Sequence, residues 1–195
     1  MTDTLKLDRK HTALLVMDYQ QSIVSRVVEK YPDLLDKTAA VLAAARATDL
    51  PISYIVVSFR EGYPEVSPRN RSFSAIRESG RMLAGNPDTE IHPQVGPRRG
   101  EIVVAKHRVG AFSTTALETI LRAQDVTSLI LCGISTSGVV LSTVRWAADI
   151  DYDLVVVEDC CADGDDEVHR VLTQKVFPRQ ARVVSANAII EDLKL

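Results

Sequence analysis

The chain carries polar groups at three points where an apolar run ends. Asp18 follows "TALLVM", Lys106 closes "EIVVAK", and the turn "GISTSG" at 133–138 continues "SLILC". A carboxylate can donate or accept a proton, and an ammonium group stabilises negative charge. Together these groups favour a functional site. The structural alternatives are that Asp18 caps a helix or turn and that Lys106 simply reaches solvent.

The turn at 133–138 has two interpretations that require the same geometry. Free backbone N–H groups at the start of a helix bind an anion or a developing oxyanion, and Gly138 allows close approach to them. Ser135, Thr136 and Ser137 are residue types that cap a helix. The turn therefore serves either as an oxyanion or substrate clamp or as a helix cap.

Apolar runs of strand length alternate with amphipathic helical stretches along the chain. The strands are expected at 12–19, 52–59, 101–107, 128–134, 153–160 and 181–186. Helices are expected at 32–49, 114–124, 137–150, 166–177 and 187–193, the last of them capped by Asn187. Residues 60–100 hold most of the prolines and little periodicity, which is typical of a long loop with room for one short helix.

This alternation predicts an α/β fold, a three-layer α/β/α sandwich around one open, mostly parallel six-stranded sheet. The length of 195 residues fits a single domain over 1–195. In such folds the ligand crevice lies beyond the carboxyl ends of the strands. Asp18, Lys106 and the turn at 133–138 all fall at that edge.

The composition of the chain argues against several classes of binding partner. The content of 46% hydrophobic and 25% charged residues excludes a disordered chain, and the net charge of −3 offers no basic field for nucleic acid. No apolar run approaches the roughly 20 residues that a bilayer requires, and the polar N-terminus is unlike a signal peptide. We therefore expect a cytoplasmic protein with no membrane partner.

Cysteine and histidine usage gives no sign of a structural disulfide or metal. Cys132, Cys160 and Cys161 are odd in number, two of them adjacent, so reduced thiols are expected. The four histidines are scattered rather than set at metal-ligand spacing. We expect neither a metal nor another cofactor.

Four blocks, "LLVMDYQ", "VVAKHRVGAF", "LILCGISTSGVV" and "EDCCAD", occur in an order and spacing that resemble the isochorismatase-like hydrolase superfamily. That family includes nicotinamidases, N-carbamoylsarcosine amidases and isochorismatases, and the resemblance covers nearly the whole chain. It implies the strand order 3-2-1-4-5-6, with Asp18 and Lys106 as catalytic residues.

The resemblance also implies an unusual turn after the fourth strand. A cis peptide is implied at Ile134 and Ser135, with backbone N–H groups near Gly138 and Val139 as an oxyanion hole. The family's catalytic cysteine aligns with Val139, so the nucleophile is missing, because valine cannot form a thioester. Cysteine-type amidase chemistry is therefore not expected.

Another thiol is the alternative to the missing nucleophile, and a nicotinamidase interpretation fails on both the thiol and the metal. Cys132 is interpreted as a buried small hydrophobe, whereas Cys160 or Cys161 could approach the crevice from the end of the fifth strand. Nicotinamidase-like members carry metal-ligating histidines in the loop after the second strand. The corresponding stretch "FREGYPEVSPRNRSF" contains none.

The resemblance includes a chemistry that needs no cysteine. Isochorismatases hydrolyse a vinyl ether with the aspartate as proton donor to the enol carbon, after which water adds. Lys106 would favour an ionised Asp18, while the apolar surroundings favour the protonated acid. The sequence leaves that balance open.

The substrate is expected to be a small organic molecule. The expected substrate contacts are Gln20, Phe59, Arg60, Tyr63 and Phe112, although an arginine in this loop can equally be a solvated charge.

Family members generally form dimers or tetramers, and Trp146 is interpreted as a packing or interface residue. We therefore expect a homo-oligomer.

Two hypotheses follow for the whole chain. The first is a cysteine-independent hydrolase of a small metabolite that uses Asp18 and Lys106. The second is a catalytically silent relative that binds a ligand or serves as a subunit of an assembly, with Val139 marking the lost chemistry.

Overall fold

A computed structural model describes residues 5 and 7–194. It contains one six-stranded sheet in the order β3-β2-β1-β4-β5-β6, and every neighbouring pair is parallel. This confirms the expected α/β class and strand order. The strands are β1 (Thr12–Met17), β2 (Ile52–Val57), β3 (Ile102–Lys106), β4 (Ser128–Ile134), β5 (Asp153–Ala162) and β6 (Arg182–Val184).

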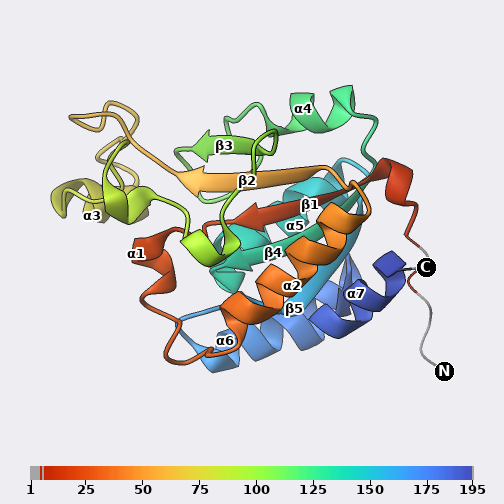
Figure 1. Ribbon diagram of the computed structural model, residues 1–195. Coiled ribbons are helices and arrows are strands. Elements are labelled where there is room, and N and C mark those ends of the chain that lie inside the picture. The colour runs from red at the N-terminus through yellow and green to blue at the C-terminus, as the bar shows by residue number, and fades with distance from the viewer. Residues whose placement is uncertain (1–4, 6, 195) are drawn as a thin grey trace.

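Helices cover both faces of the sheet, as Figure 1 shows. They are α1 (Gln21–Val24), α2 (Leu34–Ala47), α3 (Arg71–Glu78), α4 (Leu117–Ala123), α5 (Leu141–Asp149), α6 (Asp166–Val171) and α7 (Ala186–Lys194). Two wide turns of π-helix, η4 (Thr136–Val140) and η5 (Leu172–Val176), precede α5 and follow α6. No helix in the described part of the chain is long and apolar enough to cross a bilayer.

The central strands are buried on both faces because their side chains alternate between two cores. Val16 packs with Leu42 of α2 and Ile189 of α7, whereas its neighbour Leu15 packs on the other face with Leu121 of α4. Every residue of β1 and β4 is buried. A strand that is covered on both sides must read as a continuous apolar run, which is the pattern seen in the sequence.

The structure differs from the sequence prediction mainly outside the sheet. α1 was not predicted, since four residues carry too little periodicity to reveal a helix. The long loop contains α3 and two short 3-10 turns, η2 (Pro87–Thr89) and η3 (Pro93–Val95). The cap assigned to Asn187 is wrong, because the Ser185 hydroxyl accepts the Ala188 N–H at 3.3 Å and Asn187 lies inside α7.

Candidate active site

The carboxyl ends of β1, β2 and β3 meet at one edge of the sheet, with α1 and α3 beyond the arrowheads (Figure 1). Met17 pairs with Ile55 on one side of β2, and Val57 pairs with Lys106 on the other. Asp18, one residue beyond β1, therefore comes close to the last residue of β3. The parallel register alone brings the two charged groups together.

Asp18 and Lys106 form a buried ion pair, in which Lys106 Nζ lies 2.9 Å from Asp18 Oδ2. Only 7% of the aspartate side chain and 1% of the lysine side chain are exposed. The ammonium group also donates a hydrogen bond to the Arg108 carbonyl oxygen at 3.1 Å. The sequence prediction that these two residues share one rim of the sheet is consistent with this geometry.

Asp18 has a left-handed backbone, with φ of 61°. Its N–H still donates to the Ile55 carbonyl oxygen at 2.8 Å, so the chain leaves the sheet immediately after that bond. Left-handed backbone costs free energy in residues other than glycine and is common at functional sites. Aspartate is among the residue types that tolerate it best.

The buried surroundings of Asp18 disfavour its ionised form. Burial raises the pKa of this carboxyl to about 6, and the charge and hydrogen bond of Lys106 only partly offset that rise. The second carboxyl oxygen, Oδ1, is buried with no hydrogen-bond partner among the described residues. Asp18 thus has one oxygen held by Lys106 and another that makes no hydrogen bond with the described residues.

A cavity of about 370 Å³ opens next to this pair. Its walls include Asp18, Lys106, Ser135, Gly138 and Val139, so the three predicted groups converge on one space. A volume of this size suits a small organic molecule.

The turn after β4 has the implied cis peptide between Ile134 and Ser135. A Cβ atom on Gly138 would lie 2.6 Å from the Ser135 hydroxyl oxygen, so a larger residue there would force the Ser135 side chain to move. The Gly138 N–H donates to the Ser135 carbonyl oxygen at 3.2 Å. This N–H, which the resemblance assigns to an oxyanion hole, is already engaged within the turn.

Two polar groups of the turn form hydrogen bonds with α6 and with the loop before it. Thr136 shares a hydrogen bond of 2.8 Å with His169 Nδ1, and the Ser137 N–H donates to Asp163 Oδ2 at 2.7 Å. Thr136 is fully buried and does not line the cavity. Its role is to anchor the turn to α6.

Val139 lines the cavity at the position that the resemblance assigns to the cysteine, and it is buried. The thiols of Cys132, Cys160 and Cys161 are free and buried, and none of them lines this cavity. A hydrogen bond with Cys160 and burial raise the pKa of Cys132, and burial raises that of Cys161. Neither environment favours a reactive thiolate.

The structure does not bring the five expected substrate contacts to this cavity. Gln20 is fully buried and its amide bonds both the N–H and the carbonyl oxygen of Val57, at 2.7 Å and 2.8 Å. Phe112 is buried in the core beside the Tyr152 ring. Gln20 and Phe112 therefore hold the fold together rather than face a ligand.

The aromatic residues after β2 form a small core of their own. Phe59 packs against Phe73 and Tyr63, and the Tyr63 hydroxyl donates to the Arg81 carbonyl oxygen at 2.7 Å. Arg60 is exposed and pairs with Glu65 at 2.8 Å. These side chains support Phe73, which does line the cavity, without lining it themselves.

Sequence reasoning missed the wall contributed by α1 and α3. Ile23 comes from α1, Arg26 and Val27 come from the turns that follow it, and Phe73 and Ile76 come from α3. The Arg26 guanidinium has no hydrogen bond or ion pair with any described residue and is exposed. The three-residue spacing of Phe73 and Ile76 after a capping Asn70 was the available signal for α3.

The open parallel sheet in the order β3-β2-β1-β4-β5-β6 belongs to the α/β class, in which the ligand crevice lies beyond the carboxyl ends of the strands. Residues 12–188 match the Isochorismatase domain family, and the chain belongs to that family. YwoC, an isochorismatase family protein of Bacillus subtilis, is 29% identical over 194 residues, which cover 100% of each chain.

Two further relatives extend the comparison. Ureidoacrylate amidohydrolase RutB of Acinetobacter baylyi is 30% identical over 192 residues, covering 86% of this chain and 78% of its own. The crystal structure of a cysteine hydrolase from Pseudomonas syringae pv. phaseolicola superposes with a TM-score of 0.90 at 21% identity, covering 97% of this chain and 95% of that one. At that identity, the superposition supports the fold alone.

Proposed function

We propose that this chain hydrolyses a small organic metabolite without a cysteine nucleophile, with Asp18 as proton donor and Lys106 as its electrostatic partner. The observation that carries the proposal is that Asp18 lines the cavity, has a carboxyl pKa of about 6 and keeps one buried oxygen, Oδ1, without a hydrogen-bond partner among the described residues. A general acid works best when its pKa lies near the working pH.

The absence of a nucleophile at Val139 is part of this proposal. Removing the nucleophile from a catalytic unit costs about a million-fold in rate, by analogy with subtilisin. The chain's amidohydrolase relatives therefore do not supply its mechanism by themselves. A reaction that begins with proton transfer to carbon avoids the requirement for a thiol.

A vinyl ether is the substrate type that this machinery fits. The Asp18 proton adds to the terminal carbon of the C=C bond, and water then attacks the carbon that bears oxygen. The proton released by water returns to the Asp18 carboxylate, and the hemiketal splits into a carbonyl compound and an alcohol. Lys106 stabilises the carboxylate that forms when Asp18 has given up its proton.

The cavity walls favour a substrate that is apolar with an anionic group. Ile23, Val27, Phe73 and Val139 offer aliphatic and aromatic surface. Arg26 supplies an unpaired guanidinium on the same wall, which suits a carboxylate.

The test is turnover of a panel of carboxylated vinyl ethers and esters by the wild type and by Asp18→Asn. The amide cannot donate an acidic proton, so turnover should disappear while circular dichroism stays unchanged. Asp149→Asn, which alters an exposed residue at the end of α5, is the matched control and should retain full activity. Turnover by Asp18→Asn at the wild-type rate would refute the proposal.

The second candidate function is that of a family member without catalytic activity that binds a ligand. One observation favours it, namely that an aliphatic residue, Val139, lines the cavity where the resemblance places the cysteine. If no substrate is turned over but a ligand raises the melting temperature, binding is the function. The variant Val139→Cys separates the cases further. Amidase activity in this variant would show a site that retains the rest of the amidase machinery.

We also propose that the protein is a cytoplasmic homo-oligomer. The three free thiols fit a reducing compartment. Trp146 on α5 is 46% exposed, which is unusual for tryptophan on a monomer surface and typical of interfaces. Light scattering on the purified protein tests the oligomer directly, since Trp146→Gln should shift the measured mass towards the monomer.

A further inference from the structure

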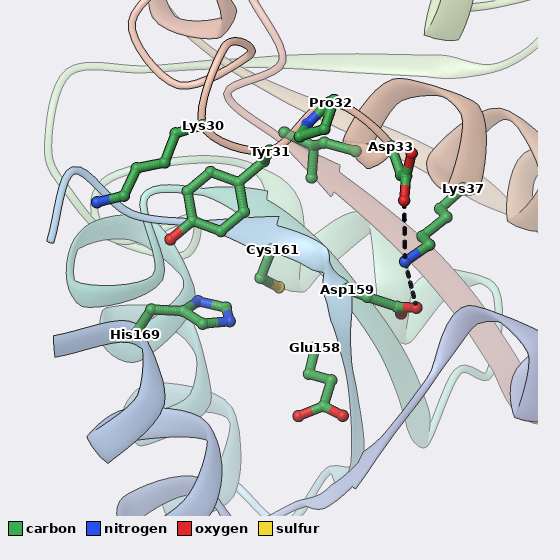
Figure 2. A pocket seen from close by; sticks show the side chains of 10 residues that line it. Lys30, Tyr31, Pro32, Asp33, Lys37, Glu158, Asp159, Cys161 and His169 are labelled. Carbon is green, nitrogen blue, oxygen red and sulfur yellow. Dashed lines mark ion pairs between the residues drawn. The ribbon is translucent and has the colours of Figure 1, made fainter. Parts of the chain in front are cut away.

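A second cavity, of about 330 Å³, lies between the connection from α1 to α2, the end of β5, and α6. It shares no lining residue with the cavity at Asp18 and Lys106. Figure 2 shows Tyr31 and His169 on one side and Lys37 with its carboxylate partners on the other. Cys161 and Glu158 lie between them in this view.

The two lysines at this second cavity are already paired. Lys37 Nζ lies 3.4 Å from Asp159 Oδ2 and 3.9 Å from Asp33 Oδ2 (Figure 2). Lys30 Nζ lies 2.9 Å from Asp166 Oδ1 and donates to the Gly164 carbonyl oxygen at 3.0 Å. Neither ammonium group is therefore left to attract an anion.

Glu158 is the charged group that remains. It is partly buried in the cavity wall, and its carboxylate has no hydrogen bond or ion pair with any described residue. The local balance is also negative, because the carboxylates of Asp33, Glu158, Asp159 and Asp166 outnumber the two ammonium groups. A cavity with an excess of one sign of charge concentrates ligands of the opposite sign.

The side of the cavity with Tyr31 and His169 (Figure 2) is aromatic, and the ammonium group of Lys30 beside it is paired with Asp166. The rings of Tyr31 and His169 meet edge to face, with centroids 5.8 Å apart. Burial lowers the pKa of His169, so its ring is neutral at neutral pH. The Tyr31 hydroxyl donates to Asp166 at 2.9 Å, which fixes the ring. An electron-rich ring face attracts a cation at short range.

We infer that this cavity is a binding site for a small organic cation, whose ammonium group pairs with the free Glu158 carboxylate while its apolar part lies against Tyr31. The carboxylate supplies charge-assisted hydrogen bonds, and the tyrosine ring supplies both apolar contact and a cation–π interaction. Because the two cavities have separate walls, this site does not depend on the chemistry proposed for Asp18.

Benzylammonium is the probe, and benzyl alcohol is its neutral counterpart of similar shape. Isothermal titration at neutral pH and low salt should show binding of the cation and at least about tenfold weaker binding of the alcohol. Glu158→Gln, which keeps the shape and removes the charge, should weaken cation binding by a similar factor. Tyr31→Leu should weaken it as well.

Two controls localise the site. Glu191→Gln removes an exposed carboxylate on α7, far along the chain from the cavity walls, and should bind the probe unchanged. Asp18→Asn removes the carboxylate that lines the other cavity and should also bind the probe unchanged. Equal affinity for benzyl alcohol, unchanged binding by a folded Glu158→Gln, or no binding up to about 20 mM would each overturn the inference.

Discussion

Replacing Lys106 by methionine should make the free energy of unfolding depend on pH above about pH 6. In the wild type, the ionisation of Asp18 no longer changes the free energy of unfolding in that range. Methionine has a similar length and fits a site that is 1% exposed. It removes the charge and the hydrogen bond that lower the pKa of Asp18. The pKa of that carboxyl should therefore rise above its wild-type value of about 6.

The direction in which stability changes with pH follows from proton linkage. Folding raises the pKa of Asp18 from 3.8 to about 6, so the folded state holds this proton more tightly than the unfolded chain does. The contribution of Asp18 to stability is full below about pH 4 and falls as the pH rises to about 6, by about 3 kcal/mol in total. Above that pH the wild-type contribution is constant.

In Lys106→Met the decline should continue beyond pH 6, at up to about 1.4 kcal/mol per pH unit, until the new pKa is reached. The stability gap between variant and wild type should therefore widen by up to about 3 kcal/mol between pH 6 and 8. Loss of the bond to the Arg108 carbonyl oxygen adds a deficit that does not change with pH.

Urea unfolding followed by circular dichroism at pH 5, 6, 7 and 8 measures this gap at fixed protein concentration. The double variant Asp18→Asn/Lys106→Met has no carboxyl to titrate, so its gap to the wild type should stay constant between pH 6 and 8. A gap for Lys106→Met that is the same at pH 6 and pH 8 would show that Lys106 does not control the ionisation of Asp18.

Three further outcomes can be measured with the same protein. The ratio kcat/KM of the wild type should fall as the pH rises through about 6, because the protonated form of Asp18 is the reactive one; a pH profile that rises with pH would contradict this. Gly138→Ala places a Cβ atom 2.6 Å from the Ser135 hydroxyl oxygen and should lower kcat, with partial recovery in Ser135→Ala/Gly138→Ala. Arg26→Gln should raise KM for a carboxylated substrate about tenfold or more while changing kcat little, and an equal effect on an uncharged analogue would argue against an anion contact.

The sheet and the rim of the site follow from the sequence because both depend on local patterns. Continuous apolar runs gave the strands, and parallel strands necessarily bring their carboxyl ends to one edge, where Asp18 and Lys106 stand. The strand order itself came from the resemblance of four sequence blocks. The 2.9 Å ion pair then follows from the register of β1, β2 and β3.

The walls of the cavity could not be predicted in the same way. Whether a loop side chain faces a ligand depends on contacts distant in sequence, as with Gln20, whose amide bonds the backbone of Val57 and Thr89. Phe59 likewise turns inward because Phe73 of α3 packs against it. Arg26 was missed because it lies in the turns after the four-residue α1, where no periodic pattern marks a structural element.

The energetics of Asp18 favour a working site over a silent one. Its burial costs about 3 kcal/mol at neutral pH relative to the protonated acid. Its left-handed backbone and the unpartnered Oδ1 add further costs. Replacing a buried ion pair by neutral residues of similar size is often neutral or stabilising. A chain that served only as a scaffold would gain stability from such a replacement, so a strained carboxylate beside a cavity is best explained by the proton that it can transfer.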